Sequence, residues 1–274
     1  MKTFGLKIAA GLGDAIFIAA ALNAIKDKFD RIYVSVRWDI ADTYRLGGQP
    51  YRQFHTEVLK LLFADPKFIL DNPDKNYPYF SVGALWAAGI PLVLPRFGKV
   101  LTTTDPLPAE IDKQYIVVTT KVRQLDSKLY KCVKIDFLAT LVELSKKYKI
   151  VIIGEREVEM NPEYLIYGNR YIYCIYDHLI GALKENVVDL TVPKLGITVP
   201  NIDTFKRDCS IMLNAKCVVT LGCGGNFILA AAVAKRLLAF RKDDYAFVSH
   251  AFKGVPQFLE TRNHKLFIDK LTEL

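Results

Sequence analysis

A glycine pair followed by an aspartate, Gly11-Leu12-Gly13-Asp14, separates two apolar runs near the start of the chain. Paired glycines between a strand and a helix are typical of dinucleotide-binding loops, because backbone N–H groups can then approach a pyrophosphate. Here Ile16 stands at the third glycine position, and Arg37 and Trp38 follow the second strand, where an acidic residue would bind a ribose. The Asp14 carboxylate would also repel a pyrophosphate. The pattern argues against an NAD site and leaves helix capping as the structural interpretation of Asp14.

A second glycine-rich segment, Gly222-Cys223-Gly224-Gly225-Asn226, lies between a strand-like run and an alanine-rich helix. Glycines let backbone N–H groups approach a phosphate closely, and the N-terminus of a helix favours negative charge. The segment therefore predicts a phosphate-binding loop. The alternative is a turn whose glycines adopt positive φ without any ligand.

Two further loops combine charge and hydroxyl groups after predicted strands. Thr120-Lys121-Val122-Arg123 offers a hydroxyl and two cations, of which Lys121 or Arg123 could pair with a diphosphate. Gly154-Glu155-Arg156 offers a carboxylate that could hold ribose hydroxyls. Both groups could equally be surface charge. The triplet Tyr176-Asp177-His178, which follows a strand-like run, is a weaker candidate for contact with a nucleotide base.

The elements that would position these loops alternate along the chain. Apolar runs and periodicity predict strands at 3–10, 31–36, 68–70, 91–95, 115–120, 149–154, 187–191, 217–222 and 236–241, and helices at 14–28, 51–63, within 78–90, at 136–147, 202–214 and 225–235, and within 256–271. Such alternation predicts parallel sheets with crossover helices, whose ligands bind beyond the carboxyl ends of the strands. The proline-rich residues 95–113 indicate a linker, or a loop with an edge strand. We therefore expect an α/β protein with two Rossmann-like domains, 1–108 and 109–274.

Composition limits the classes of protein. Hydrophobic residues make up 51% and charged residues 24% of the 274 residues, which is typical of a folded globular chain. The longest apolar stretch, 16–25, is too short to span a bilayer, and Met1-Lys2 does not begin a secretory signal, so we expect a cytoplasmic protein. The net charge of +8 favours an anionic partner: a nucleotide, a nucleic acid or an anionic membrane surface.

The cysteines and histidines show no metal-ligand spacing, so no metal site is predicted. Most of the cysteines are expected to be small buried hydrophobes, namely Cys132, Cys174, Cys209 and Cys217. Cys223 differs because it stands between glycines in the predicted phosphate loop, where a catalytic thiol is an alternative to simple burial.

Three segments together resemble glycosyltransferase family 9, the heptosyltransferase-like group of GT-B enzymes. Residues 11–26, GLGDAIFIAAALNAIK, are similar to the family's opening G-D pair and following helix. Residues 137–159 resemble its helix, strand and G-x-x-E segment, and residues 205–240 resemble its helix, strand and D-S-G-x-x-H segment. The last match departs from the family, because Gly222-Cys223-Gly224 replaces D-S-G and Phe227 stands at the histidine position.

The resemblance implies a metal-independent transfer of a sugar from a nucleotide-diphosphate sugar to an acceptor hydroxyl. Asp14 would be the general base, Gly13 would help to bind the donor, and domain closure over a central cleft would exclude water. Arg37, Trp38 and Asp39 would line the acceptor side, with Trp38 either stacking on a sugar ring or packing in the hinge. The donor is a co-substrate, and no resident cofactor is expected.

The acceptor stays open between a glycan, a lipid-linked saccharide and a nucleic-acid base, with anionic membrane contact as a further expectation. Two other classes also stay open. The first is a non-catalytic nucleotide-binding protein, in which Asp14 is only a cap. The second is a nucleic-acid-binding module that uses the lysine clusters at 121–134, 146–149 and 235–242.

Overall fold

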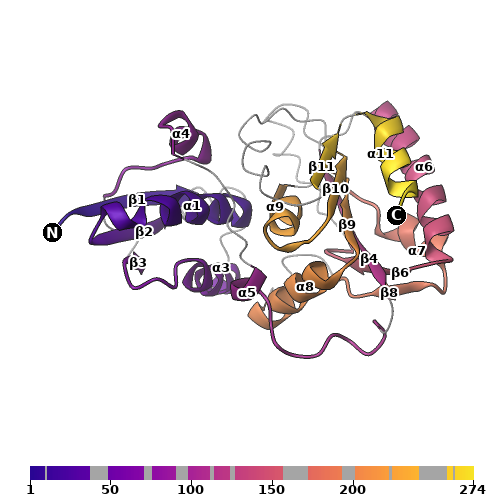
Figure 1. Cartoon of the computed structure of the whole chain (residues 1–274), viewed down its shortest axis with the longest axis horizontal. Coiled ribbons are helices and arrows are strands. Elements are labelled where there is room, and N and C mark those ends of the chain that lie inside the picture. The colour runs from indigo at the N-terminus through magenta and orange to yellow at the C-terminus, as the bar shows by residue number, and fades with distance from the viewer. Residues whose placement is uncertain are drawn as a thin grey trace.

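The computed structural model describes residues 1–9, 11–37, 49–70, 76–90, 98–111, 114–123, 127–156, 172–192, 201–221, 224–240, 258–261 and 263–274. In these ranges the chain forms two parallel sheets with helices around them (Figure 1). The prediction of an α/β fold with two Rossmann-like halves is confirmed.

The N-terminal half contains a three-stranded parallel sheet in the order β1 (Thr3–Ala9), β2 (Arg31–Arg37), β3 (Phe68–Leu70). On the other side of β1, Tyr79 makes a parallel bridge with Lys7, so a later segment of the chain flanks the first strand. The order of segments across the sheet therefore reverses at β1. The helices of this half are α1 (Leu12–Ile25), the 3₁₀ turn η1 (Lys26–Lys28), α3 (Gln49–Leu62) and α4 (Val82–Ala87).

The C-terminal half contains a six-stranded, fully parallel sheet in the order β11-β10-β9-β4-β6-β8. The strands are β4 (Tyr115–Thr119), β6 (Lys149–Ile153), β8 (Val187–Asp189), β9 (Cys217–Thr220), β10 (Leu237–Phe240) and β11 (Phe258–Thr261). Counted along the chain, the order from β8 is third, second, first, fourth, fifth, sixth. This is the doubly wound Rossmann order, and its topological switch point lies between β4 and β9.

Helices cover both faces of the six-stranded sheet, as the residues of β4 show, since they alternate between two cores. Ile116 and Val118 pack with α6 (Ser127–Ser145), α7 (Tyr176–Leu183) and α11 (His264–Thr272). Val117 belongs to the opposite core, with α8 (Ile202–Asn214) and α9 (Gly224–Val233). The strand Tyr115–Thr119 is buried along its whole length, as expected for a parallel strand covered on both faces.

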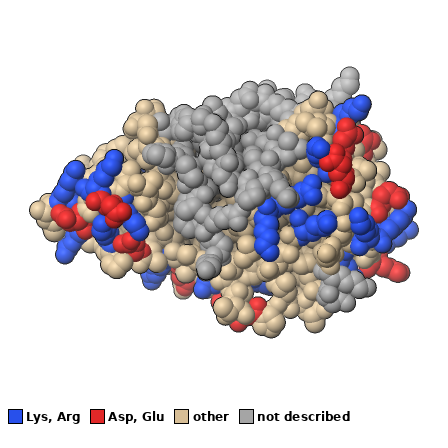
Figure 2. All heavy atoms as spheres, viewed as in Figure 1, with Lys and Arg blue, Asp and Glu red and all other residues tan. Residues whose placement is uncertain are grey.

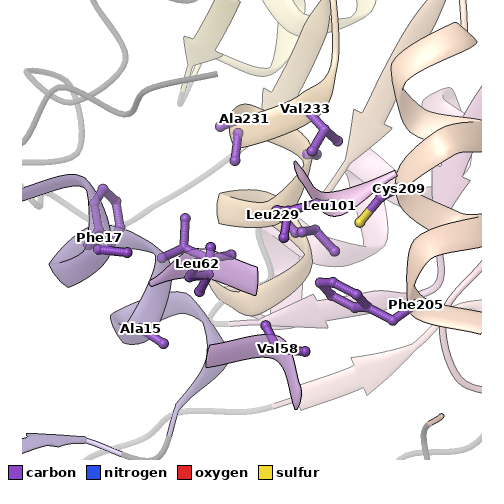
Figure 3. Close-up of a cluster of buried hydrophobic side chains, with 14 of the residues drawn as sticks. Ala15, Phe17, Val58, Leu62, Leu101, Phe205, Cys209, Leu229, Ala231 and Val233 are labelled. Carbon is purple, nitrogen blue, oxygen red and sulfur yellow. The ribbon is translucent and has the colours of Figure 1, made fainter. Parts of the chain in front are cut away.

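The two halves share one apolar core. Helix α1 is apolar nearly all round and packs against β1, α3, α4 and α9. Phe54 of α3 meets Phe205 of α8 edge to face, with ring centroids 5.7 Å apart. Figure 3 shows this cluster, in which Phe17 and Leu62 from the N-terminal half lie near Leu229 from α9.

The segment predicted to be a linker packs on the C-terminal half. Its helix α5 (Gly98–Leu101) contacts α8, and Leu101 is fully buried. The backbone N–H of Thr103 donates to Ser210 Oγ at 2.9 Å. No strand occurs in the described part of this segment, 98–111. The boundary at 108/109 stays a prediction, and the strand predicted at 91–95 lies outside the described residues.

Most predicted elements are confirmed, including 202–214 as a helix with the same bounds. Helix α6 begins at Ser127 instead of 136. The structure also contains an antiparallel pair that the pattern did not predict, β5 (Lys121–Arg123) with β7 (Ile172–Cys174).

Candidate functional site

The switch point of the six-stranded sheet is marked by two buried threonines at the carboxyl ends of neighbouring strands. Thr119 Oγ1 on β4 donates to Thr220 Oγ1 on β9 at 3.0 Å, and both residues are fully buried. In open parallel sheets, ligands bind outside the carboxyl ends at this point. The first turn of α9, which follows β9, contains Gly224, Gly225 and Asn226. A helix presents unpaired backbone N–H groups in its first turn, so this turn can hold an anion at the switch point.

The segment 120–123, predicted as a loop, is a strand after its first residue. Lys121 on β5 pairs in register with Cys174 on β7, and Arg123 pairs with Ile172. Thr120 is fully buried, and its hydroxyl donates to the Glu155 carbonyl oxygen at 2.7 Å. That hydrogen bond ties the end of β4 to the end of β6. The predicted roles of Thr120, Lys121 and Arg123 toward a diphosphate stay predictions.

The turn after β6 requires glycine. Gly154 has a φ of 111°, a conformation that strains any residue with a side chain. The turn continues into a parallel bridge between Glu155 and Val192, and the Arg156 N–H donates to the Val192 carbonyl at 2.9 Å. Glu155 is only 9% exposed. Its predicted contact with ribose hydroxyls stays a prediction.

The sequence did not predict that Tyr176 and Arg156 belong to one polar network beside this turn, and the predicted contact of 176–178 with a nucleotide base stays a prediction. Asp189, the last residue of β8, accepts hydrogen bonds from the Tyr176 hydroxyl at 2.7 Å and from the Thr191 hydroxyl and N–H. Arg156 Nη2 lies 3.4 Å from Asp189 Oδ2, and Arg156 Nε donates to Thr191 Oγ1 at 3.0 Å. Burial alone would raise the pKa of Asp189, but the hydrogen bonds from Thr191 and Tyr176 and the charge of Arg156 lower it overall. Asp189 is thus held as a carboxylate.

Asp14 is exposed in the first turn of α1, at the carboxyl end of β1. The N-cap residue is Gly11, so Asp14 is the third residue of the helix and not its N-cap. A Cβ at position 11 would lie 2.9 Å from Asp14 Oδ2, which shows that the carboxylate folds back against Gly11. Gly13 is buried behind it. The helix dipole favours the ionised carboxylate, and its exposure leaves it accessible to a hydroxyl group.

Arg37 lies beside the same strand end, since it pairs in register with Ala9. Its guanidinium stands over the Tyr79 ring at 5.0 Å from the centroid, so the two side chains meet from opposite sides of β1. Tyr79 is 42% exposed and was not singled out by its sequence context. Trp38 and Asp39, the other predicted acceptor-side residues, lie outside the described residues, as do Gly222 and Cys223 of the predicted phosphate loop.

Two of the helices that follow strand ends are in contact. They are α1, after the first strand of the N-terminal half, and α9, after the fourth strand of the C-terminal half. α1 begins after β1 with Asp14 in its first turn, α9 begins after β9, and the two helices pack together in the shared core (Figure 1). The structure therefore joins the Gly11–Asp14 segment and the α9 helix through one interface. That Asp14 and the 222–226 segment face each other across a central cleft stays a prediction.

Two described lysines lie at the other edge of the sheet. Lys147 and Lys216 both stand over the Tyr148 ring, at 4.9 and 5.0 Å from its centroid. They precede β6 and β9, so they lie at the amino edge of the sheet, opposite the switch point. On the face in Figure 2, basic side chains lie over both halves and alternate with acidic ones near the two ends.

Three further features of the described residues concern metal binding, membrane crossing and the cysteines. These residues contain no cluster of three or more His, Cys, Asp or Glu side chains able to hold a metal ion. None of the helices among them combines the length and apolarity needed to cross a membrane. Cys209 and Cys217 are buried as expected, and burial raises the pKa of Cys217 to about 12. Cys174 is half-buried.

Similarity to known proteins supports the fold. No protein-family model matches the chain. The chain is similar to the iron-containing dodecameric glycosyltransferase TibC from enterotoxigenic E. coli H10407, with a TM-score of 0.50 and 13% identity over 94% of this chain. It spans 62% of the length of that protein. E. coli ADP-heptose lipopolysaccharide heptosyltransferase II aligns over 96% of this chain and 91% of its own, with a TM-score of 0.49 and 13% identity.

The likeness to TibC shows a GT-B fold, in agreement with the sequence resemblance. A curated relative has a different activity: LL-diaminopimelate aminotransferase from Aquifex aeolicus (strain VF5) is 23% identical over 158 residues. That match covers 50% of this chain and 40% of the enzyme, so it does not carry the enzyme's function to this chain.

Proposed function

We propose that the protein is a glycosyltransferase that moves a sugar from a nucleotide-diphosphate sugar to an acceptor hydroxyl. The observation that carries this proposal is a pair of Rossmann-like sheets in which the ends of β1 and β9 bear groups suited to the two parts of this reaction. One end has the exposed carboxylate of Asp14, and the other has the glycine-rich first turn of α9. Transfer from a nucleoside diphosphate needs a base near the acceptor and positive groups on the leaving diphosphate.

In this proposal the C-terminal half binds the donor. The first turn of α9 receives the diphosphate, supported by Gly222 and Cys223 and by Lys121 or Arg123 from β5. These groups stabilise the negative charge that develops on the leaving group, so that no metal ion is required. Thr120 holds the ends of β4 and β6 together through its bond to the Glu155 carbonyl, and Glu155 is the candidate for ribose contact.

The N-terminal half then binds the acceptor, with Arg37, Trp38 and Asp39 on its side of the site. Asp14 takes the proton of the acceptor hydroxyl as the acceptor oxygen bonds to the anomeric carbon. The bond from that carbon to the diphosphate breaks, and the nucleoside diphosphate leaves with the electron pair. The chain's likeness to TibC, which has been solved with ADP-D-beta-D-heptose, supports a nucleotide-sugar donor.

The acceptor is proposed to be a glycan, a lipid-linked saccharide or a modified nucleic-acid base that carries a hydroxyl group. Arg37 and the exposed ring of Tyr79 together offer a charged group and an aromatic surface near the carboxyl end of β1, the strand that Asp14 follows. Such a pair suits a sugar ring bearing hydroxyl or acidic groups. A cytoplasmic location with contact to an anionic membrane belongs to the same proposal, because a lipid-linked acceptor would require it.

The test is release of nucleoside diphosphate from a panel of nucleotide sugars by the wild type and by Asp14→Asn. Loss of the base should reduce transfer about 10²- to 10⁴-fold, while calorimetry with the nucleoside diphosphate gives an unchanged Kd. Asp27→Asn is the matched control, since Asp27 is an exposed carboxylate beyond the other end of α1. Transfer by Asp14→Asn at a rate near that of the wild type would show that Asp14 is not the general base.

A second variant tests the donor side. Arg123→Ala should weaken binding of the nucleoside diphosphate by about tenfold, the usual value of a charge-assisted hydrogen bond. An unchanged affinity would exclude Arg123 from the diphosphate site and leave Lys121 as the candidate on β5.

A further inference from the structure

The polar network around Arg156 lies at the same edge of the sheet as the proposed phosphate site, but two strands away from the switch point. The strand order is β9-β4-β6-β8, and Asp189 ends β8. At the usual spacing of strands, the end of β8 is about 10 Å from the end of β4. A ribose and a base can cross this span. A ligand with its diphosphate at α9 would therefore bring its nucleoside end toward Arg156.

Arg156 is oriented by three neighbours and is still accessible. Its Nε donates to Thr191 Oγ1 at 3.0 Å, its Nη2 faces Asp189 Oδ2 at 3.4 Å, and its guanidinium carbon lies 5.6 Å from the Tyr176 ring centroid. Nevertheless 46% of its side chain is exposed. An arginine that served only to neutralise Asp189 would not need a planar group held against an aromatic ring.

The charge balance of the network suits an uncharged ligand group. Asp189 offsets the charge of Arg156, and it is itself fixed by the hydroxyls of Tyr176 and Thr191. Phosphate binding favours uncompensated cations, whereas a paired guanidinium keeps its flat surface and its donors. Flat guanidinium groups stack on nucleobases as aromatic side chains do.

We propose that Arg156, positioned by Asp189, Thr191 and Tyr176, is the docking surface for the heterocyclic base of a nucleoside diphosphate. The proposal rests on the function proposed above and adds the residue that recognises the base. Tyr176 supports one side of the guanidinium, and the base lies against the exposed side. Asp189 is a positioning residue, because it acts through Arg156.

The experiment measures binding of ADP, UDP, GDP and pyrophosphate to the full chain by calorimetry. Arg156→Ala should raise the Kd of the nucleoside diphosphate that binds best by about tenfold, in the range found when base stacking is removed. The Kd of pyrophosphate should change less than twofold, because pyrophosphate has no base. Arg156→Lys should resemble Arg156→Ala, since lysine keeps the charge but lacks the plane. Tyr176→Phe keeps the ring, loses the hydrogen bond to Asp189, and should have a smaller effect.

Arg236→Ala is the control, because it removes the same charge just before β10, at the opposite edge of the sheet. Three results would each overturn the inference and leave the proposed function standing. In Arg156→Ala they are an equal rise in the Kd of pyrophosphate, or an unchanged Kd of the nucleoside diphosphate. In Arg156→Lys it is a wild-type Kd of the nucleoside diphosphate. Failure of the wild type to bind any of the three nucleoside diphosphates would instead refute the proposed function. Thermal melting of each variant separates a loss of binding from a loss of folding.

Discussion

The substitution Gly11→Ala should separate catalysis from stability, because it moves the Asp14 carboxylate without disturbing the backbone. Gly11 has φ −76° and ψ 131°, which any residue can adopt. An added Cβ would stand 2.9 Å from Asp14 Oδ2, closer than carbon and oxygen atoms pack. The carboxylate must then shift by a few tenths of an ångström or rotate away.

The expected magnitudes follow from these distances. Alanine is a poorer N-cap than glycine, but it also reduces the freedom of the unfolded chain, so the free energy of unfolding should change by less than about 1 kcal/mol. A base displaced by several tenths of an ångström should slow transfer by roughly 10- to 100-fold. Only the rate should therefore change substantially.

The assay compares release of nucleoside diphosphate from a nucleotide sugar with urea unfolding of the same samples. Gly181→Ala is the matched control, because a Cβ at that helical position meets nothing within 4 Å. The reasoning is refuted if Gly11→Ala transfers sugar within twofold of the wild type. It is also refuted if the rate falls only in proportion to a loss of folded protein.

Three further predictions concern the core and its ionisable groups. Phe205→Ala should lower the free energy of unfolding by about 3–5 kcal/mol in urea melts, because the ring is buried against Phe54 between the two halves; a loss below 1 kcal/mol would show that the halves do not depend on this contact. Burial lowers the pKa of His55 from 6.5 to about 4, so the unfolded state binds the proton first and the free energy of unfolding should fall as the pH drops from about 6.5 to 4. His55→Leu should flatten this pH dependence, and an unchanged slope would contradict the assignment to His55. Burial raises the pKa of Tyr115 from 10 to about 12, so the unfolded state loses its proton first and the free energy of unfolding should fall as the pH rises through that interval. In Tyr115→Phe this fall should be reduced, and a fall as steep as in the wild type would refute the assignment to Tyr115.

Much of the fold could be predicted because strands and helices of an α/β protein carry local signals. The apolar run at 115–119 forms a central strand buried along its length, and the apolar residues 15–22 of α1 are buried among other elements as predicted. The partner of α1 could not be predicted, since apolarity all round says that a helix is covered but not by which element. The antiparallel pair of β5 and β7 was missed because β5, with Lys121 and Arg123 at its ends, shows no apolar pattern, and because a run of three residues such as 172–174 does not indicate its partner strand.

Candidate site residues could be predicted from the sequence where they lie next to glycines at strand ends. They could not be predicted where they depend on contacts between residues far apart along the chain. Glycine spacing predicted that Asp14 and the 224–226 segment would lie where a helix follows a strand, which the structure confirms, whereas the role of Asp14 came from the family resemblance and stays a prediction. The network of Arg156, Tyr176 and Asp189 was not predicted, because Arg156 and its partner Thr191 are 35 residues apart. Tyr79 was missed for the same reason, since only the bridge to Lys7 brings it to β1.

The most direct test of the proposed function is a thermal-shift and calorimetric screen of nucleoside diphosphates and nucleotide sugars against the full chain. Ligand that binds the folded state raises its melting temperature by mass action. One nucleoside diphosphate and its sugar conjugates are expected to stabilise the protein, and one of these conjugates is expected to be turned over in an Asp14-dependent manner. Absence of binding by every member of the panel would contradict the proposed function.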